Sequence, residues 1–173
     1  MQIHGFGGCG QTAVMSAYGQ KNIANSVADR DKLKHAPNIS CPVQPSLYVY
    51  CHPELSAESH YRRGWNDLQS AKLNPKGSGV PRKYSDYLER TCKNQDGFGF
   101  LNNFRSWNAC ETVLPVTIED FHDEEKIDQI SRFTGVDTPS NFIKGRKSTL
   151  KGSCLDDTWA TIQSEAAQKW ASI

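Results

Sequence analysis

Short apolar stretches alternate along the chain with longer segments whose apolar residues recur at helical spacing. The short stretches, at residues 3–6, 46–51 and 112–118, are rich in β-branched and aromatic residues and have the length of strands. Pro115 favours an edge position or a bulge for the third, because proline cannot donate to a sheet. The longer segments predict helices at residues 12–18, 53–73, 84–92, 98–109, 123–134 and 156–171. Strands alternating with helices predict an α/β fold, with a central parallel β-sheet flanked by helices.

The length of the chain fits one domain. A chain of 173 residues can bury a sizeable hydrophobic core. Residues 74–82 are rich in proline and glycine and predict a loop within the domain. We therefore expect a single domain over residues 1–173, with the loop and helix of residues 138–173 packed on it.

The net charge and the arrangement of the cysteines restrict which partners and which cellular compartment we expect. The 20 basic and 19 acidic residues nearly cancel, so we expect neither nucleic acid nor membrane as a partner. No apolar run approaches the ~20 residues of a membrane span, and no leader pattern opens the chain. The six cysteines form no C-x-x-C pair and no compact metal spacing. This pattern predicts reduced, packing cysteines in a cytoplasmic protein that binds no metal.

A glycine-rich stretch, Gly-Phe-Gly-Gly-Cys-Gly-Gln-Thr at residues 5–12, joins the first predicted strand to the first predicted helix. In this geometry, backbone N–H groups and a helix N-terminus converge on a phosphate or sulfate. The spacing fits the P-loop pattern G-x-x-x-x-G-K-[ST], except that Gln11 replaces the lysine. An ordinary strand-to-helix turn is the alternative interpretation. The predicted anion-binding residues are Gly7, Gly8, Cys9, Gly10, Gln11 and Thr12.

Two further blocks follow this loop in a recognisable order. Residues 48–61 contain Cys-His-Pro followed by Ser59, and residues 96–121 end on a strand and Glu119-Asp120-Phe121. Together the three blocks resemble the P-loop sulfotransferases, which transfer a sulfuryl group from 3′-phosphoadenosine 5′-phosphosulfate to a hydroxyl or amine. The resemblance covers most of residues 2–137. It implies a three-layer P-loop-type fold, places the 5′-phosphosulfate at the glycine loop, and places the 3′-phosphate at Ser59.

The chain departs from the family pattern at two charged positions. The family lysine falls on Gly8, and the arginine of R-x-P falls on Cys51. Positioned cations stabilise charge that develops during group transfer, and losing one commonly costs several kcal/mol of barrier. Arg63 shares a helix with Ser59 and is one candidate replacement, although a solvated basic turn is equally compatible. A basic turn that loosely resembles a late family segment, or that is simply a surface loop, contributes Arg146 and Lys147.

His35, in the segment Lys-His-Ala-Pro at residues 34–37, is the candidate catalytic base. The resemblance often places a histidine near the acceptor in this part of the chain. A neutral imidazole near pH 7 can take the proton of the acceptor hydroxyl as the sulfuryl group is transferred. A purely structural histidine is the alternative.

The sequence is therefore compatible with three functions. The first is direct sulfuryl transfer, without metal or covalent intermediate, to a small-molecule or carbohydrate acceptor. The second is a non-catalytic binding or assembly module with the same fold, which the missing lysine and arginine favour. The third is a P-loop nucleotide kinase, against which stand Gln11 and the lack of a strand that ends in an aspartate for Mg²⁺.

Overall fold

A three-stranded parallel sheet organises the chain in the computed structural model, which describes residues 1–28, 34–37, 40–93, 96–139 and 153–173. The strands are β1 (Gln2–Gly5), β2 (Ser46–Val49) and β3 (Val113–Val116), in the order β1-β2-β3. The described part of the chain therefore has a mixed α/β fold with a parallel sheet, as the sequence predicts. Pro115 lies on β3 at the edge of this sheet, where its missing N–H costs no ladder hydrogen bond.

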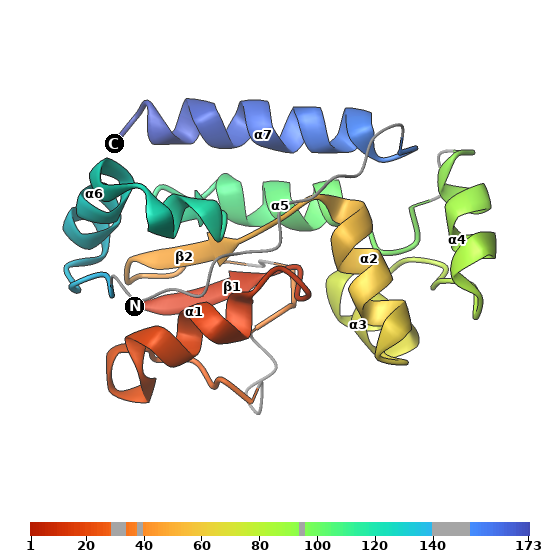
Figure 1. Cartoon of the computed structure of the whole chain (residues 1–173), viewed down its shortest axis with the longest axis horizontal. Helices are drawn as coiled ribbons and strands as arrows, with labels where there is room; N and C mark the ends of the chain where they lie inside the picture. Colours follow the sequence, from red (N-terminus) through yellow and green to blue (C-terminus); the bar gives the residue numbers. More distant parts are fainter. Residues whose placement is uncertain (29–33, 38–39, 94–95, 140–152) are drawn as a thin grey trace.

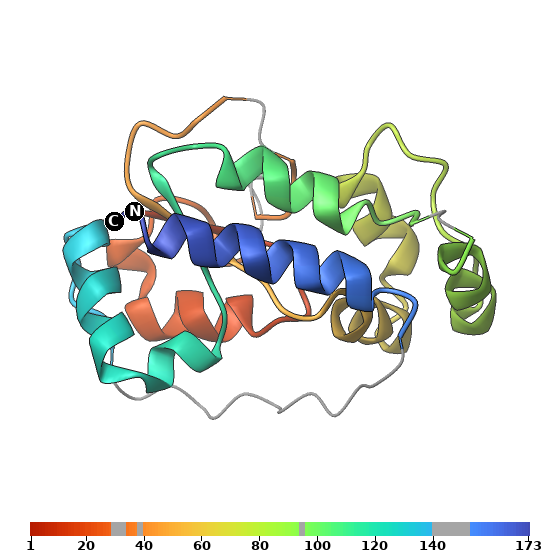
Figure 2. The same ribbon diagram turned by 90° about the horizontal axis from the view of Figure 1, so that it is seen from above.

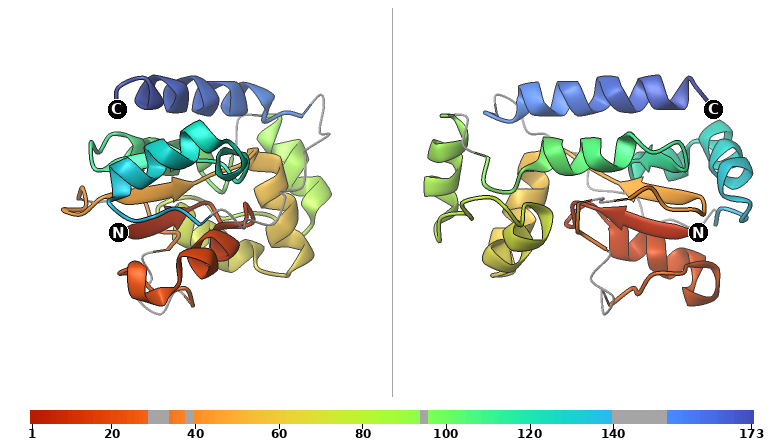
Figure 3. Two further views of the ribbon diagram at one scale, coloured as in Figure 1. Left: turned by 60° about the vertical axis from the view of Figure 1, so that its left-hand side comes forward. Right: turned by 180° about the vertical axis from the view of Figure 1, so that it is seen from behind.

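Helices cover both faces of the sheet. Figure 2 shows α1 and α5 on opposite sides of the strands, with α7 running beside α5 along the β3 edge of the sheet. At this edge Trp170 Nε1 of α7 donates to Pro115 O over 2.9 Å. In Figures 1 and 3, α7 accordingly lies at the end of the molecule opposite α1. Helices α2 and α3 lie beyond the carboxyl ends of β1 and β2 (Figure 1). The α-helices of the described ranges are α1 (Gln11–Tyr18), α2 (Pro53–Arg62), α3 (Asn66–Leu73), α4 (Tyr84–Thr91), α5 (Phe100–Asn108), α6 (Glu124–Thr134) and α7 (Asp156–Trp170).

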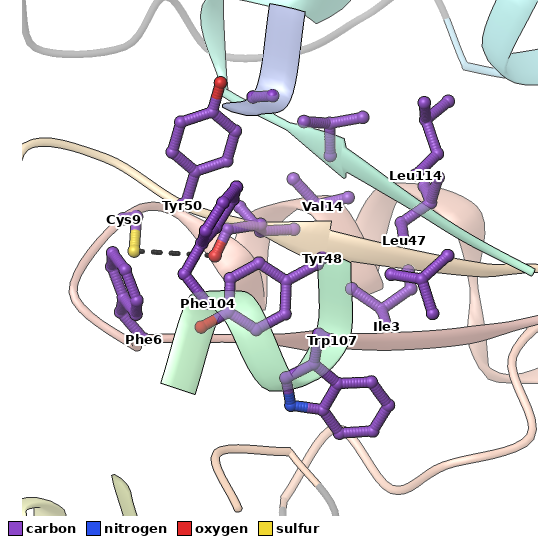
Figure 4. Packing of buried hydrophobic residues seen from close by; sticks show 14 of the residues in the cluster. Ile3, Phe6, Cys9, Val14, Leu47, Tyr48, Tyr50, Phe104, Trp107 and Leu114 are labelled. Atoms are coloured by element: carbon purple, nitrogen blue, oxygen red, sulfur yellow. Dashed lines mark hydrogen bonds between the residues drawn. The ribbon is translucent and has the colours of Figure 1, made fainter. Parts of the chain in front are cut away.

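The core between the sheet and α5 is largely aromatic. Tyr48 of β2 is fully buried and packs edge-on against Phe6 and Phe104, with ring centroids 5.7 and 5.8 Å apart (Figure 4). Rings of this size bury a large apolar area and prefer such edge-to-face contacts. The stacked rings of His4 and Trp107, 3.7 Å apart, extend this contact between sheet and helix. The aromatic core thus fixes the strand ends from which the site is built.

The helix predicted over residues 53–73 is wrong in one respect, because it divides into α2 and α3. Gly64 takes a left-handed conformation with φ +68°, which glycine adopts without a Cβ penalty. Its N–H donates to Tyr61 O over 3.0 Å, and the N–H of Trp65 donates to His60 O over 2.9 Å. This is the Schellman arrangement that ends helices. The chain therefore turns at Gly64 and starts α3 in a new direction.

The prediction of reduced cysteines is also wrong for four of the six. Cys41 is bonded to Cys110 and Cys92 to Cys154, with Cα atoms 5.4 and 5.0 Å apart. The partners are 69 and 62 residues apart in sequence, and pairing over such separations cannot be deduced from spacing alone. Cys9 and Cys51 are the free cysteines. None of the helices in the described ranges has the length and hydropathy that crossing a bilayer requires.

Candidate anion-binding site

A pocket of about 520 Å³ lies beside the glycine loop and the first turn of α1. Its size falls within the range of small-molecule sites, roughly 300–1,000 Å³. Three parts of the chain that are distant in sequence meet there: the loop with α1, the segment around residue 34, and the turn from α2 to α3 with α3 itself. The lining residues are Gly7, Gly8, Gly10, Gln11, Thr12, Ala13, Val27, Ala28, Lys34, His35, His60, Arg63, Trp65, Leu68, Gln69 and Lys72.

The glycine loop takes a conformation that other residues rarely adopt. Gly7, Gly8 and Gly10 have φ values of +75°, +72° and +80°. A Cβ on Gly7 would lie 2.9 Å from Cε1 of both His35 and His60, so the two imidazoles flank this residue closely. The loop therefore needs glycine at position 7 for its backbone angle as well as for space.

Side chains from other segments hold three successive carbonyl groups of the loop region. His35 Nδ1 lies 2.9 Å from Gly5 O, and His60 Nε2 lies 3.1 Å from Phe6 O. Ser56 Oγ donates to Gly7 O over 2.8 Å. Because these carbonyl oxygens already accept hydrogen bonds, their repulsion of a nearby anion is reduced.

The N-terminus of α1 adds a favourable dipole to the pocket. Gly10 is its N-cap residue, no side chain caps the helix, and its first turn contains no acidic residue. The first backbone N–H that bonds within the helix is that of Val14, which donates to Gly10 O over 3.0 Å. The preceding N–H groups, from Gln11 to Ala13, belong to residues that line the pocket. A helix end of this kind attracts an anion through its N–H groups and its positive dipole.

Cationic side chains surround this helix end. Lys34 is only 5 % exposed, and its Nζ donates to Thr12 Oγ1 and to Val27 O, each over 2.9 Å. Lys72 is half-buried in the lining, and Arg63 is exposed at the rim. Among the described residues that line the pocket, none is acidic. The described part of the lining therefore carries positive charge, although the whole chain is nearly neutral.

Gln11 does not take the place of a P-loop lysine. Its Nε2 donates to Ile3 O over 3.2 Å and to Lys34 O over 3.1 Å, so the side chain joins α1 to β1 and to the segment around residue 34. The side chain therefore holds the scaffold together and directs no charge at the loop.

Several buried hydrogen-bond acceptors of the pocket have no protein partner. In the described part of the chain, five buried side-chain polar atoms have none, and three belong to lining residues: Gln11 Oε1, His60 Nδ1 and Gln69 Oε1. Buried polar atoms are nearly always hydrogen-bonded in native proteins, so such a concentration calls for an explanation. All three atoms are fully buried, so a ligand can donate to one of them only after the side chain turns toward the pocket.

The two histidines of the pocket have different neighbours. Burial, opposed by the hydrogen bond to Phe6 O, lowers the pKa of His60 to about 4, so this imidazole is neutral at pH 7. His35 is held through its backbone, because Asn103 Nδ2 of α5 donates to His35 O over 3.2 Å. A hydrogen bond from His35 Nδ1 to Gly5 O requires the proton on Nδ1, which makes Nε2 the basic nitrogen.

The structure brings together most of the residues predicted from the sequence. Gly7, Gly8, Gly10, Gln11, Thr12, His35 and Arg63 line the pocket. Cys9 and Ser59 are outside the lining but support the loop: the Cys9 thiol donates to Gly7 O over 3.0 Å, and a Cβ on Gly8 would lie 3.0 Å from the Ser59 Cβ. Arg146 and Lys147 lie outside the described residues.

Besides Ala13, Val27 and Ala28, sequence reasoning missed six lining residues. Lys34 directly precedes His35, and His60 directly follows Ser59, so proximity to a predicted site residue was the available signal. The remaining residues belong to the second half of what the sequence predicts as one continuous helix. The break at Gly64 is what places them at the pocket. These residues are Trp65, Leu68, Gln69 and Lys72.

Neither the described residues nor comparisons with known proteins indicate a metal or a family for this site. Within the described ranges, no group of three or more His, Cys, Asp or Glu residues is arranged to hold a metal ion. No protein-family model, curated protein or solved structure matches the chain.

Proposed function

We propose that the pocket binds 3′-phosphoadenosine 5′-phosphosulfate and that the chain is a sulfotransferase with a three-layer P-loop-type fold. The observation that carries the proposal is the pocket itself. It combines a glycine loop, an uncapped helix N-terminus and three cationic side chains, with no acidic residue among the described ones that line it. This composition favours a multiply charged anion over a neutral ligand.

Lys34 is the cation that we propose in place of the family lysine missing at Gly8. Its Nζ lies 2.9 Å from Thr12 Oγ1, at the first turn of α1, where the 5′-phosphosulfate is expected. Burial strengthens the attraction of its positive charge for an anion, because few water molecules screen it there. Arg63 and Lys72, nearer the rim, are placed to balance the remaining phosphate charge.

The proposed reaction is a direct transfer with His35 as general base. The acceptor oxygen forms a bond to sulfur while the bond from sulfur to the 5′-phosphate oxygen breaks. The acceptor proton passes to His35 Nε2, and adenosine 3′,5′-bisphosphate leaves with the electron pair of the broken bond. Lys34 and the N–H groups of α1 stabilise the negative charge that develops on the leaving phosphate.

The two disulfides bear on where the protein works. Disulfides persist in oxidising compartments and are rare in the cytoplasm. The bonds Cys41–Cys110 and Cys92–Cys154 therefore weigh against the cytoplasmic location expected from the sequence. We propose an oxidising compartment as the site of action.

Titration calorimetry with adenosine 3′,5′-bisphosphate tests the nucleotide site. We expect a dissociation constant in the micromolar range and weaker binding of adenosine 5′-phosphate, which lacks the second phosphate. No heat of binding at millimolar bisphosphate would contradict the proposal. Binding without transfer of radioactive sulfate to any acceptor would favour a non-catalytic binding module, and magnesium-dependent ATP turnover would favour a kinase.

A further inference from the structure

The rim of the pocket carries two exposed apolar side chains. Trp65 and Leu68, here called the rim pair, are 47 % and 56 % exposed. The other large hydrophobic side chains exposed in the described part of the chain are Val43 and Ile173, neither of which lines the pocket. The rim pair therefore offers apolar contact area at the entrance to an otherwise polar and cationic pocket.

Backbone hydrogen bonds hold the segment that carries the rim pair in one conformation. The Schellman turn at Gly64 fixes the position of Trp65, the N-cap residue of α3, and Leu68 follows on the first turn of that helix. The Gln69 N–H donates to Trp65 O over 2.8 Å, which closes this turn. A surface held in place before binding loses little conformational entropy when a ligand docks.

The side-chain carbonyl oxygen of Gln69, the residue after Leu68, accepts no hydrogen bond. The residue is 6 % exposed and its Oε1 has no partner. The final torsion of a glutamine side chain is soft, so its amide can turn toward a ligand at little cost. Once the amide has turned, its Oε1 can accept a hydrogen bond from a ligand hydroxyl.

Positive charge flanks the rim pair on both sides. The guanidinium carbon of Arg63 lies 5.4 Å from the centre of the Trp65 ring. Lys72 is one turn beyond Leu68 on α3 and also lines the pocket. These cations suit a carboxylate or sulfate on the ligand, and no acidic residue among the described lining opposes it.

We propose that the acceptor is an acidic saccharide that docks on the rim pair. The C–H face of its ring packs on Trp65, because C–H bonds carry slight positive charge and the indole face is negative. A ring hydroxyl donates to Gln69 Oε1, and the acidic group lies near Arg63 and Lys72. This inference rests on the proposed function, since it assigns the acceptor of the same pocket.

Direct binding of a saccharide tests the inference without relying on turnover. The probe is an oligogalacturonate, compared by calorimetry with a neutral maltooligosaccharide of equal length. We expect the acidic chain to bind at least tenfold more tightly. Trp65→Ala should weaken its binding about tenfold, the size of one lost ring contact, whereas Trp65→Phe should restore most of it. Val43→Ala is the matched control, because it removes an exposed apolar side chain away from the pocket.

The Lys72→Gln variant tests the contribution of positive charge, and sulfate-transfer assays test whether the saccharide is the acceptor. Lys72→Gln should reduce the preference for the acidic over the neutral chain, with the affinity for adenosine 3′,5′-bisphosphate lowered in the same variant because Lys72 also faces the nucleotide. Val43→Ala, away from the pocket, should leave the bisphosphate affinity unchanged. Sulfate transfer to the oligogalacturonate but not to 4-nitrophenol supports the inference, and the reverse preference overturns it.

Failure of this inference can be told apart from failure of the proposed function. A wild-type protein that binds the bisphosphate but neither oligosaccharide overturns the saccharide assignment alone, as does a Trp65→Ala variant that binds the acidic chain like Val43→Ala. A wild-type protein that binds the acidic chain through Trp65 but not the bisphosphate supports the saccharide site and overturns the nucleotide site.

Discussion

Lys34 Nζ donates a hydrogen bond to Thr12 Oγ1 over 2.9 Å, which joins a buried ammonium to the helix turn that follows the glycine loop. This contact links two segments that are 22 residues apart. It gives the pocket a cation that the glycine loop itself does not contain.

Lys34→Met should weaken binding of adenosine 3′,5′-bisphosphate about tenfold to a hundredfold. The reason is that a charged hydrogen bond to the phosphate, about 1.5–3 kcal/mol, is lost while the aliphatic stem is retained. Lys34→Arg should recover part of the affinity. Calorimetry measures both variants, and circular dichroism checks their fold. Equal affinities in wild type and Lys34→Met would contradict the role given to Lys34.

Gly7→Ala should destabilise the loop more than a comparable change at an open position. The new methyl group would meet both His35 and His60 at 2.9 Å, in addition to the cost of a positive φ. Gly135→Ala is the matched control, since Gly135 is left-handed with φ +66° and has nothing within 4 Å of its Cβ position. Denaturant unfolding should show a loss of about 1–2 kcal/mol for Gly135→Ala and about 1–3 kcal/mol more for Gly7→Ala. Equal losses would mean that the loop moves freely.

Stability should fall as the pH drops from about 6.5 toward 4 because of His60. Its pKa is 6.5 in the unfolded chain and about 4 in the fold, so within this window the unfolded chain binds the proton more strongly. Above pH 6.5 both states are neutral and the effect vanishes. The full lowering corresponds to about 3 kcal/mol. His60→Gln should have a shallower dependence of the unfolding free energy on pH in this range, and an unchanged slope would contradict the assignment.

Thiol titration should find two free cysteines without reductant and six after reduction and unfolding. Cys9 and Cys51 are the free pair. The hydrogen bond with Cys9 and burial raise the pKa of the Cys51 thiol, so few thiolates form at pH 8 and native labelling should be slow. Labelling in urea should be fast. Six reactive thiols in unreduced protein would contradict both disulfides.

Local patterns in the sequence predicted the sheet and most of the helices correctly. Pro115 indicated an edge strand because the missing N–H has the same consequence in any sheet. The helix predicted over residues 123–134 corresponds to α6, and Gly135 ends it with φ +66°, a conformation that favours glycine. Gly64 carried the same kind of signal, but apolar residues at helical spacing continue on both sides of it. Periodicity alone therefore predicted one helix where there are two.

The lining of the pocket could be predicted only in part, because it depends on tertiary contacts that no local pattern reveals. The glycine loop could be found from its spacing, but the positions of Lys34 and Lys72 around it depend on how distant segments pack. Asn103 and Trp107 of α5 hold the backbone of His35 and Ala36, from 68 and 71 residues away. The pairing of the cysteines could not be predicted for the same reason, since contacts between residues so far apart in sequence depend on the whole fold.

The two disulfides overlap along the chain, since Cys92 lies between Cys41 and Cys110 while Cys154 lies beyond both. Any single peptide bond cut between residues 41 and 154 is therefore spanned by at least one covalent bridge. A protease that nicks the protein once in this region leaves its pieces joined, and they separate on a gel only after reduction. A single cut between residues 41 and 154 would thus not release the sheet from the helices that cover it.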